Sequence, residues 1–159
     1  MNIITTRFGE IDVDESKVIH MRGSIIGFEH LKQFVLQKKD ENNPFWWFQS
    51  IEDGAIAFVV INPFIAKTDY EPVIDDNDAK LLEIECAEDV VMLAIATIRQ
   101  NPFCVSINLR APVAINAKRK IAKQIVLEDP SYPVQYYLTT KGSDNGITSS
   151  ENCEEGDVK

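Results

Sequence analysis

The stretch that decides the fold is residues 108–128, which reads NLRAPVAINAKRKIAKQIVLE. Alternate positions of its first half are apolar, a period typical of a strand with one face against a core (Leu109, Ala111, Val113 and Ile115). A polar break at 117–120 separates this half from a second run that is also apolar on one face (Ile121, Ile125 and Leu127). We therefore predict a long β-hairpin with a basic tip. Arg110 and Asn116 should lie on its wetter face, and Pro112, which cannot donate to a ladder, should lie at an edge or a bend.

Other short apolar runs extend this pattern to both sides. Residues 2–7 and 10–14, joined by Phe8-Gly9, indicate an opening hairpin, and 57–61 and 90–98 read as buried strands. About ten short strands with turns every ~8 to 12 residues favour one antiparallel β-barrel-like domain, because closing a sheet leaves few unpaired edges. The predicted fold class is therefore mainly β, with one or two short helices, over residues 1–140.

Four consecutive aromatic residues at 45–48, Phe-Trp-Trp-Phe, fall in one of these strands. Neighbouring side chains of a strand point to opposite faces, so both faces are covered or one pair is exposed. The aromatic residues either fill the core of a closed sheet or place one ring in a partner groove.

A run of acidic residues at 75–78, Asp-Asp-Asn-Asp, raises the question of a calcium loop. With Asp75 at the first position, the loop template would need an acid or amide at Ala79, a glycine at Lys80 and a glutamate at Cys86, so it fails three times. We expect these acids to cap a short helix that continues through Leu81 and Leu82.

Composition limits the function further. The chain has 159 residues, 25 of them acidic and 16 basic, which gives a net charge of −9. This is one domain's length, and a field of this sign repels phosphate backbones and attracts basic partners. Nucleic acid is therefore not expected as a direct ligand.

The three cysteines, Cys86, Cys104 and Cys153, are odd in number and lack metal-ligand spacing, so we expect reduced thiols of a cytoplasmic protein. No signal peptide and no apolar run of about 20 residues is present, so no membrane span is expected. Residues 141–159 carry few large aliphatic side chains and a net charge of −3, and we expect a disordered acidic tail.

Catalysis is not predicted. Neither His20 nor His30 stands in a metal or nucleophile motif, and Cys104 lies in an apolar run, where it is expected to be a small buried side chain. The sequence contains no Walker A loop, GxSxG or GxGxxG motif. The basic tip (Lys118, Arg119, Lys120 and Lys123) is too small for a nucleic-acid footprint, and contact with an acidic patch on a protein partner is at least as plausible. This leaves a binding module without cofactors.

Four segments in order, GFEHLKQFVL (27–36), PFWWFQS (44–50), AFVVINP (57–63) and NLRAPVAINAKRKIAKQIVLED (108–129), resemble the flagellar assembly factor family, FliW. The resemblance implies a non-catalytic cytoplasmic protein, monomeric when free, that holds flagellin. When flagellin is exported, it binds the RNA-binding translational regulator CsrA and relieves the repression of flagellin mRNA. Gln135-Tyr136 stands where relatives commonly have Arg-His, so a role for that pair is not carried over.

The polar loops beside these segments are the predicted partner surface. Its candidate residues are Asn62, Pro63, Phe64, Tyr70, Glu71, Asn108, Arg110 and Pro112. The alternative is a generic OB-like barrel that binds nucleic acid or oligosaccharide. Exposed aromatic residues in a basic groove would favour that alternative, and the acidic net charge favours the first interpretation.

Overall fold

The hairpin predicted at residues 108–128 is present in the structure, a computed structural model that describes residues 1–38, 40–99, 103–140 and 147–149. Its arms are β9 (Val113–Asn116) and β10 (Ile121–Gln124), which pair antiparallel. Pro112 lies just before β9, outside the strand, as predicted. Asn116 differs from the prediction, because it is only 1% exposed. The side chain is buried because its amide bridges to the chain segment that passes over the hairpin.

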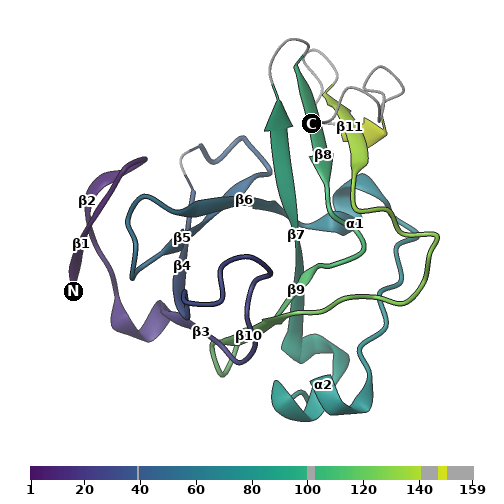
Figure 1. Cartoon of the computed structure of the whole chain (residues 1–159), viewed down its shortest axis with the longest axis horizontal. Helices are drawn as coiled ribbons and strands as arrows, with labels where there is room; N and C mark the ends of the chain where they lie inside the picture. Colours follow the sequence, from purple (N-terminus) through teal and green to yellow (C-terminus); the bar gives the residue numbers. More distant parts are fainter. Residues whose placement is uncertain (39, 100–102, 141–146, 150–159) are drawn as a thin grey trace.

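Around this hairpin the sheet closes into a barrel of seven strands (Figure 1). Closure depends on β7, the longest strand, whose first half pairs with β9 and whose second half pairs with β6. The ring therefore runs β7-β6-β5-β4-β3-β10-β9 and returns to β7. The bounds of the remaining strands of the ring are β3 (Ile19–Met21), β4 (Gln33–Gln37), β5 (Trp46–Ser50), β6 (Ala57–Ile61) and β7 (Val90–Arg99).

One pairing in the ring is parallel, which corrects the prediction of an entirely antiparallel sheet. Ile121 and Ala122 of β10 lie beside His20 and Met21 of β3 in parallel register. These two strands are far apart in the chain, and they meet because the intervening strands have passed once round the barrel. Alternation along the sequence sets the direction of hairpin neighbours only, so it could not predict the orientation of this pair.

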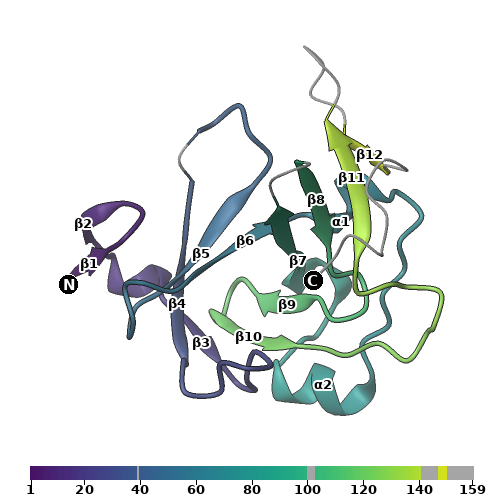
Figure 2. The same ribbon diagram turned by 45° about the horizontal axis from the view of Figure 1, so that its top comes forward.

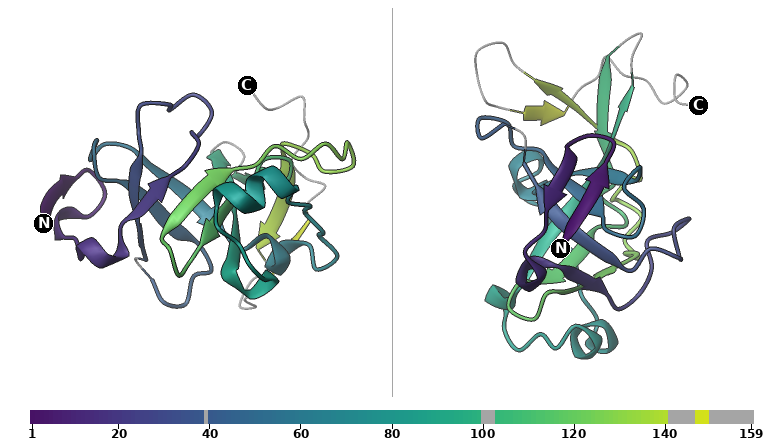
Figure 3. Two further views of the ribbon diagram at one scale, coloured as in Figure 1. Left: turned by 90° about the horizontal axis from the view of Figure 1, so that it is seen from below. Right: turned by 90° about the vertical axis from the view of Figure 1, so that its left-hand side faces the viewer.

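The other elements extend the barrel at two opposite ends (Figures 1 and 3). At one end is a separate hairpin of β1 (Asn2–Thr5) and β2 (Gly9–Asp12), as predicted. At the other end β7 continues the sheet through β8 (Cys104–Ile107), β11 (Tyr136–Thr140) and β12 (Ile147–Ser149). The helical segments are α1 (Pro63–Ala66), α2 (Asp76–Leu81) and the 3-10 turns η1 (Glu15–Lys17) and η2 (Ala87–Asp89).

The two largest apolar clusters of the described residues hold these layers together. The first fills the barrel and contains Phe34 and Phe48, whose rings stack with centroids 4.4 Å apart. The second lies outside β7, β9 and β10 and is covered by β8, β11 and the loops that carry α1 and α2. Burial of both faces explains why β9 reads as a nearly continuous apolar run.

The four aromatic residues at 45–48 differ in their exposure to solvent. Phe48 is 1% exposed in the barrel core, whereas Trp46 at the start of β5 is 36% exposed. Cations cover both tryptophans, with the Arg7 guanidinium 4.9 Å from the ring centre of Trp47 and the Lys38 ammonium 4.7 Å from that of Trp46. Part of the run is therefore core, and Trp46 remains available at the surface.

Two local predictions are confirmed in detail. The side chain of Asp75 accepts a hydrogen bond of 2.8 Å from the backbone N–H of Asp78 and caps α2. The turn of the first hairpin contains Gly9 with φ +69°, a conformation that favours glycine. A second glycine, Gly54, is required for another reason, since a Cβ there would lie 1.8 Å from the carbonyl oxygen of Ile4.

The prediction of reduced thiols is wrong for Cys104, which is disulfide-bonded in the structure. Spacing along the chain does not say which cysteines approach in space. Cys86 is free and exposed. The predicted disordered tail, 141–159, also lies outside the described residues apart from β12, which pairs with β11. Within the described part of the chain no helix is long and apolar enough to cross a bilayer.

Candidate partner-binding surface

The predicted surface begins at α1, directly after β6. Asn62 caps this short helix, its side-chain oxygen accepting a hydrogen bond of 2.9 Å from the N–H of Phe64. Pro63 occupies the first helical turn, where its missing N–H costs nothing, and is buried. Phe64 and Ile65 are 38% and 46% exposed. Asn62 and Pro63 therefore stabilise a short helix that exposes the apolar side chains of Phe64 and Ile65 to solvent.

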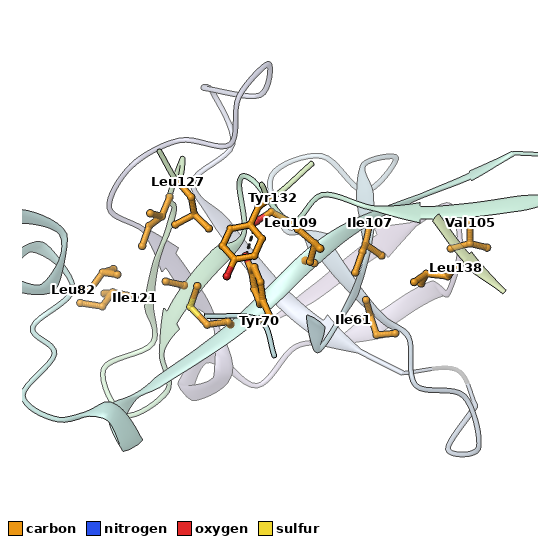
Figure 4. Packing of buried hydrophobic residues seen from close by; sticks show 14 residues of the cluster. Ile61, Tyr70, Leu82, Val105, Ile107, Leu109, Ile121, Leu127, Tyr132 and Leu138 are labelled. Atoms are coloured by element: carbon orange, nitrogen blue, oxygen red, sulfur yellow. Dashed lines mark hydrogen bonds between the residues drawn. The ribbon is translucent and has the colours of Figure 1, made fainter. Parts of the chain in front are cut away.

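Behind α1 lies a buried pair of tyrosines (Figure 4). Tyr70, which is 2% exposed, donates a hydrogen bond of 2.6 Å to the carbonyl oxygen of Leu109, and its ring meets that of Tyr132 edge-on at 4.8 Å. The hydroxyl of Tyr132 accepts a hydrogen bond of 2.9 Å from the N–H of Glu71. Burial raises the pKa of Tyr70, so it stays neutral at physiological pH. The pair fixes the loop after α1 against the approach to β9.

Arg110 and Asn108 form hydrogen bonds to the backbone on the opposite side of the tyrosine pair. The guanidinium of Arg110 donates to the carbonyl oxygens of Tyr132 and Pro130, at 3.0 and 3.2 Å. The side-chain oxygen of Asn108 accepts from the N–H groups of Arg110 and Ala111, at 3.0 and 2.9 Å. Both side chains therefore stabilise the turn that replaces the start of the predicted hairpin arm. Arg110 is half-buried, with most of its described contacts inside the molecule.

Of the eight candidate residues, the structure connects six around the tyrosine pair: Asn62, Phe64, Tyr70, Glu71, Asn108 and Arg110. Pro63, in the first turn of α1, has a buried side chain. Pro112 is buried, and its carbonyl oxygen accepts from the N–H of Ile125 at 2.8 Å, which makes it part of the hairpin and not of the surface.

An acidic groove begins at this pair, between the segment before α2 and the exit from β10. It has a volume of about 300 Å³. Its exposed apolar residues are Val73 and Val126, which are 75% and 58% exposed. The complete lining is Glu71, Val73, Asp75, Asp78, Ile125, Val126, Leu127, Glu128, Asp129 and Tyr132.

The carboxylates of the acidic groove are not equivalent. Asp78 forms an ion pair with Lys123, and Asp75 caps α2. Hydrogen bonds from Ser131 lower the pKa of Asp129, with a smaller effect from the charge of Arg110, so this group stays ionised. Glu71 and Glu128 are exposed, and no described contact engages their carboxylates. The groove therefore offers negative charge beside exposed aliphatic side chains.

Of the residues that line this groove, the sequence predicted only Glu71 as a candidate contact, and it did not predict Val126 or Glu128. Val126 and Glu128 lie at the exit of the hairpin, where the alternation of the second arm puts them on the face opposite Ile125 and Leu127. The signal was thus present in the hairpin sequence, but the side chains that complete the groove come from residues 71–78, about fifty positions earlier. Among the described residues no group of three His, Cys, Asp or Glu side chains could hold a metal ion.

Comparison with known proteins shows the family of this chain. The family model for the FliW protein matches residues 2–138, which include the barrel, α1 and the acidic groove. The chain belongs to the FliW family. A flagellar assembly factor FliW of Syntrophus aciditrophicus is 50% identical over 136 residues, which are 86% of either chain.

A flagellar assembly factor FliW of Geobacter sulfurreducens is 40% identical over 136 residues, 86% of this chain and 85% of that one. A crystal structure of the flagellar assembly factor FliW superposes with a TM-score of 0.79 at 34% identity, covering 86% of this chain and 95% of the other. These relatives are flagellar assembly factors, in agreement with the predicted family.

Proposed function

We propose that this FliW-family chain is a cytoplasmic, monomeric flagellar assembly factor that holds flagellin and, when free of flagellin, binds the translational regulator CsrA. Partner exchange would then couple flagellin export to translation of its mRNA. Family membership over residues 2–138 is the observation that carries this proposal. No catalytic step is involved.

The acidic groove supports the CsrA part of the proposal. An RNA-binding protein carries basic surface to neutralise phosphates, and a groove with Glu71, Glu128 and Asp129 is complementary to such a surface. Val73 and Val126 add apolar area that is desolvated when a partner covers it, at about 25 cal/mol per Å². Charge would thus guide the encounter, and the aliphatic side chains would stabilise the complex.

Within the predicted set of residues, the proposal assigns contact roles to Phe64 and Glu71, because their side chains are exposed. Asn62, Asn108 and Arg110 act as positioning residues, since their polar atoms are engaged with backbone groups. The buried Tyr70 and the two prolines, Pro63 and Pro112, support the surface without touching a partner.

The test of exchange is a calorimetric titration of CsrA into this protein at increasing flagellin concentration. Exclusive binding raises the apparent Kd of CsrA without limit as flagellin rises, whereas coupling between two separate sites reaches a plateau, typically within a factor of about 5 to 150. A ternary complex with unchanged CsrA affinity, or no binding of either protein, would refute the proposal.

The test of the acidic groove is a matched pair of charge reversals. Glu128→Lys and Glu10→Lys each change the net charge from −9 to −7, but Glu10 lies on β2 at the far end of the molecule (Figure 1). Glu128→Lys should slow association with CsrA and weaken its dependence on salt, and Glu10→Lys should leave both near the unmodified values. Equal effects of the two variants would show that net charge, and not the groove, guides binding.

A further inference from the structure

One end of the barrel is open and lined by apolar side chains that point inward. Side chains alternate along a strand, so Trp46 shares a face with Phe48, Leu36 with Phe34, and Val91 with Leu93. Phe48, Phe34 and Leu93 all belong to the core that fills the barrel. The side chains of Trp46, Leu36 and Val91 therefore also face the barrel axis, and they lie nearer to the end of the barrel than these core residues.

These inward-facing residues are nevertheless accessible to solvent. Trp46 is 36% exposed and Val91 is 43% exposed, although their neighbours two positions along are buried. They surround a cavity of about 350 Å³, which we call the barrel mouth. Its lining residues are Lys17, Ile19, Val35, Leu36, Trp46, Val91, Ile115, Ala117 and Lys120. The tip of the β9–β10 hairpin, which points toward β4 in Figure 2, closes one side.

Three lysines surround the barrel mouth. Lys17 and Lys120 line it directly, and the ammonium of Lys38 lies 4.7 Å from the ring centre of Trp46. The salt bridges between described residues include none of the three. In a chain of net charge −9 this is a local concentration of positive charge around an apolar opening.

Lys120 has a further property that sets it apart. Its φ is +58°, in the left-handed region that favours glycine, and it is half-buried at the tip of the hairpin. Glycine would satisfy this backbone geometry without the steric cost that a Cβ brings. The lysine side chain is held at the tip, because its ammonium donates to the carbonyl oxygen of Ala117, so its positive charge lies beside the opening.

We propose that the barrel mouth binds an acidic segment of a partner protein, which inserts one large apolar side chain between Trp46 and Val91 and places flanking carboxylates near Lys17 and Lys120. The mouth, at about 350 Å³, has room for a large aliphatic or aromatic side chain. The mouth lies on barrel strands and the hairpin tip, and it shares no lining residue with the acidic groove. The proposal therefore does not depend on how CsrA is bound.

The chemistry of the mouth favours such a peptide over a nucleic acid strand. Binding of single-stranded nucleic acid uses aromatic faces on which successive bases stack, along a basic track. Here the lining is mainly aliphatic, the face of its one aromatic residue is already covered by Lys38, and the net charge repels an extended polyanion. A single apolar side chain with adjacent carboxylates fits both the shape of the mouth and the positive charge around it.

The test uses three blocked pentapeptides and the full chain. The first has one leucine between two pairs of glutamates, the second has alanine in place of the leucine, and the third has lysines in place of the glutamates. Binding is followed by tryptophan fluorescence and by amide NMR shifts at the mouth. We expect the leucine–glutamate peptide to bind about tenfold or more tighter than the other two, equivalent to about 1.4 kcal/mol, and to weaken as salt rises.

Two matched pairs of variants locate the site. Val91→Asp and Ile98→Asp place a carboxylate on the same strand at side chains that are 43% and 44% exposed, but Ile98 lies at the other end of β7 and outside the mouth. Val91→Asp should abolish binding of the leucine–glutamate peptide, and Ile98→Asp should leave it unchanged. Lys120→Gly should weaken binding while raising the Tm, whereas Lys118→Ala on the same tip should leave binding unchanged.

Three outcomes would overturn the proposal. One is equal binding of the leucine–glutamate and lysine peptides. Another is binding of a single-stranded oligonucleotide that Val91→Asp abolishes, which would assign the mouth to nucleic acid. The third is a dimer seen by light scattering that Val91→Asp dissociates, which would make a second copy of this chain the occupant. If Val91→Asp fails to fold, the Lys120→Gly and Lys118→Ala pair decides the question.

Discussion

Tyr70→Phe tests whether the buried tyrosine pair is scaffold or contact surface. The substitution removes one hydroxyl that is buried and donates to the carbonyl oxygen of Leu109 at 2.6 Å. No other described donor reaches that oxygen, so the carbonyl loses its hydrogen bond inside the protein. An unsatisfied buried acceptor costs about 1–3 kcal/mol, and we expect a loss of about 2 kcal/mol in the free energy of unfolding.

Thermal and urea denaturation provide the assay. For a domain of this size a loss of 1 kcal/mol lowers the Tm by about 2–4 °C, so Tyr70→Phe should lower it by about 4–8 °C. The slope of the urea transition should stay the same, since the packing of the ring is retained. The control is Phe64→Ala, which removes a ring that is 38% exposed and should affect stability less.

The order of the two variants should be reversed for partner affinity, which Phe64→Ala should change and Tyr70→Phe should not. Because Tyr70 is 2% exposed, Tyr70→Phe should leave the Kd for CsrA and for flagellin unchanged at a temperature where the variant is folded. Phe64→Ala should weaken whichever partner covers α1. An unchanged Tm for Tyr70→Phe would refute the hydrogen-bond argument, and a loss of binding without a loss of stability would move Tyr70 to the contact surface.

Three more predictions follow from single contacts. Gly54→Asn should cost about 1–3 kcal/mol, because any Cβ at this position meets backbone, whereas Gly9→Asn at an open positive-φ turn should be tolerated in the same thermal assay. Asn116→Ala should cost about 2–3 kcal/mol, because its amide donates to two backbone carbonyls and accepts from two N–H groups, and Asn116→Asp should not restore stability at neutral pH. Burial raises the pKa of Tyr70 in the folded protein, so its contribution to stability is complete below about pH 10. Above that pH the tyrosine deprotonates in the unfolded chain only, and the contribution is lost as pH rises. The Tm of Tyr70→Phe should therefore fall less steeply above about pH 10 than that of the unmodified protein, and equal slopes would contradict this.

Local physical rules were enough for much of the barrel. The alternation around residues 108–128, the Phe8-Gly9 turn and the cap at Asp75 each depend on side chains within a few positions of one another, and all three are present. The closed sheet followed from the number of short strands, since closure leaves few edges unpaired. These features needed no knowledge of which distant segments meet.

The features that were missed all depend on distant segments. The parallel pairing of β3 with β10 joins strands about one hundred residues apart, and the burial of Asn116 depends on the carbonyl oxygens of Leu82 and Glu83, to which its amide donates. An asparagine at the end of an alternating strand looks solvent-facing until the covering segment is known. For the same reason the sequence did not predict the acidic groove, of whose lining only Glu71 was a candidate contact.

Net charge acts on an extended polyanion as a whole, but it does not describe either candidate binding surface, because the two have opposite local charge. The acidic groove has its unengaged carboxylates, Glu71 and Glu128, beside Val73 and Val126, whereas the barrel mouth has lysines around an apolar opening. Interactions between exposed charges are largely screened beyond about 8 Å at physiological salt, so each surface acts on a partner mainly through its own nearby groups. A chain of net charge −9 can therefore attract a basic partner at one place and an acidic segment at another. The two encounters should respond independently to Glu128→Lys and to Lys120→Gly.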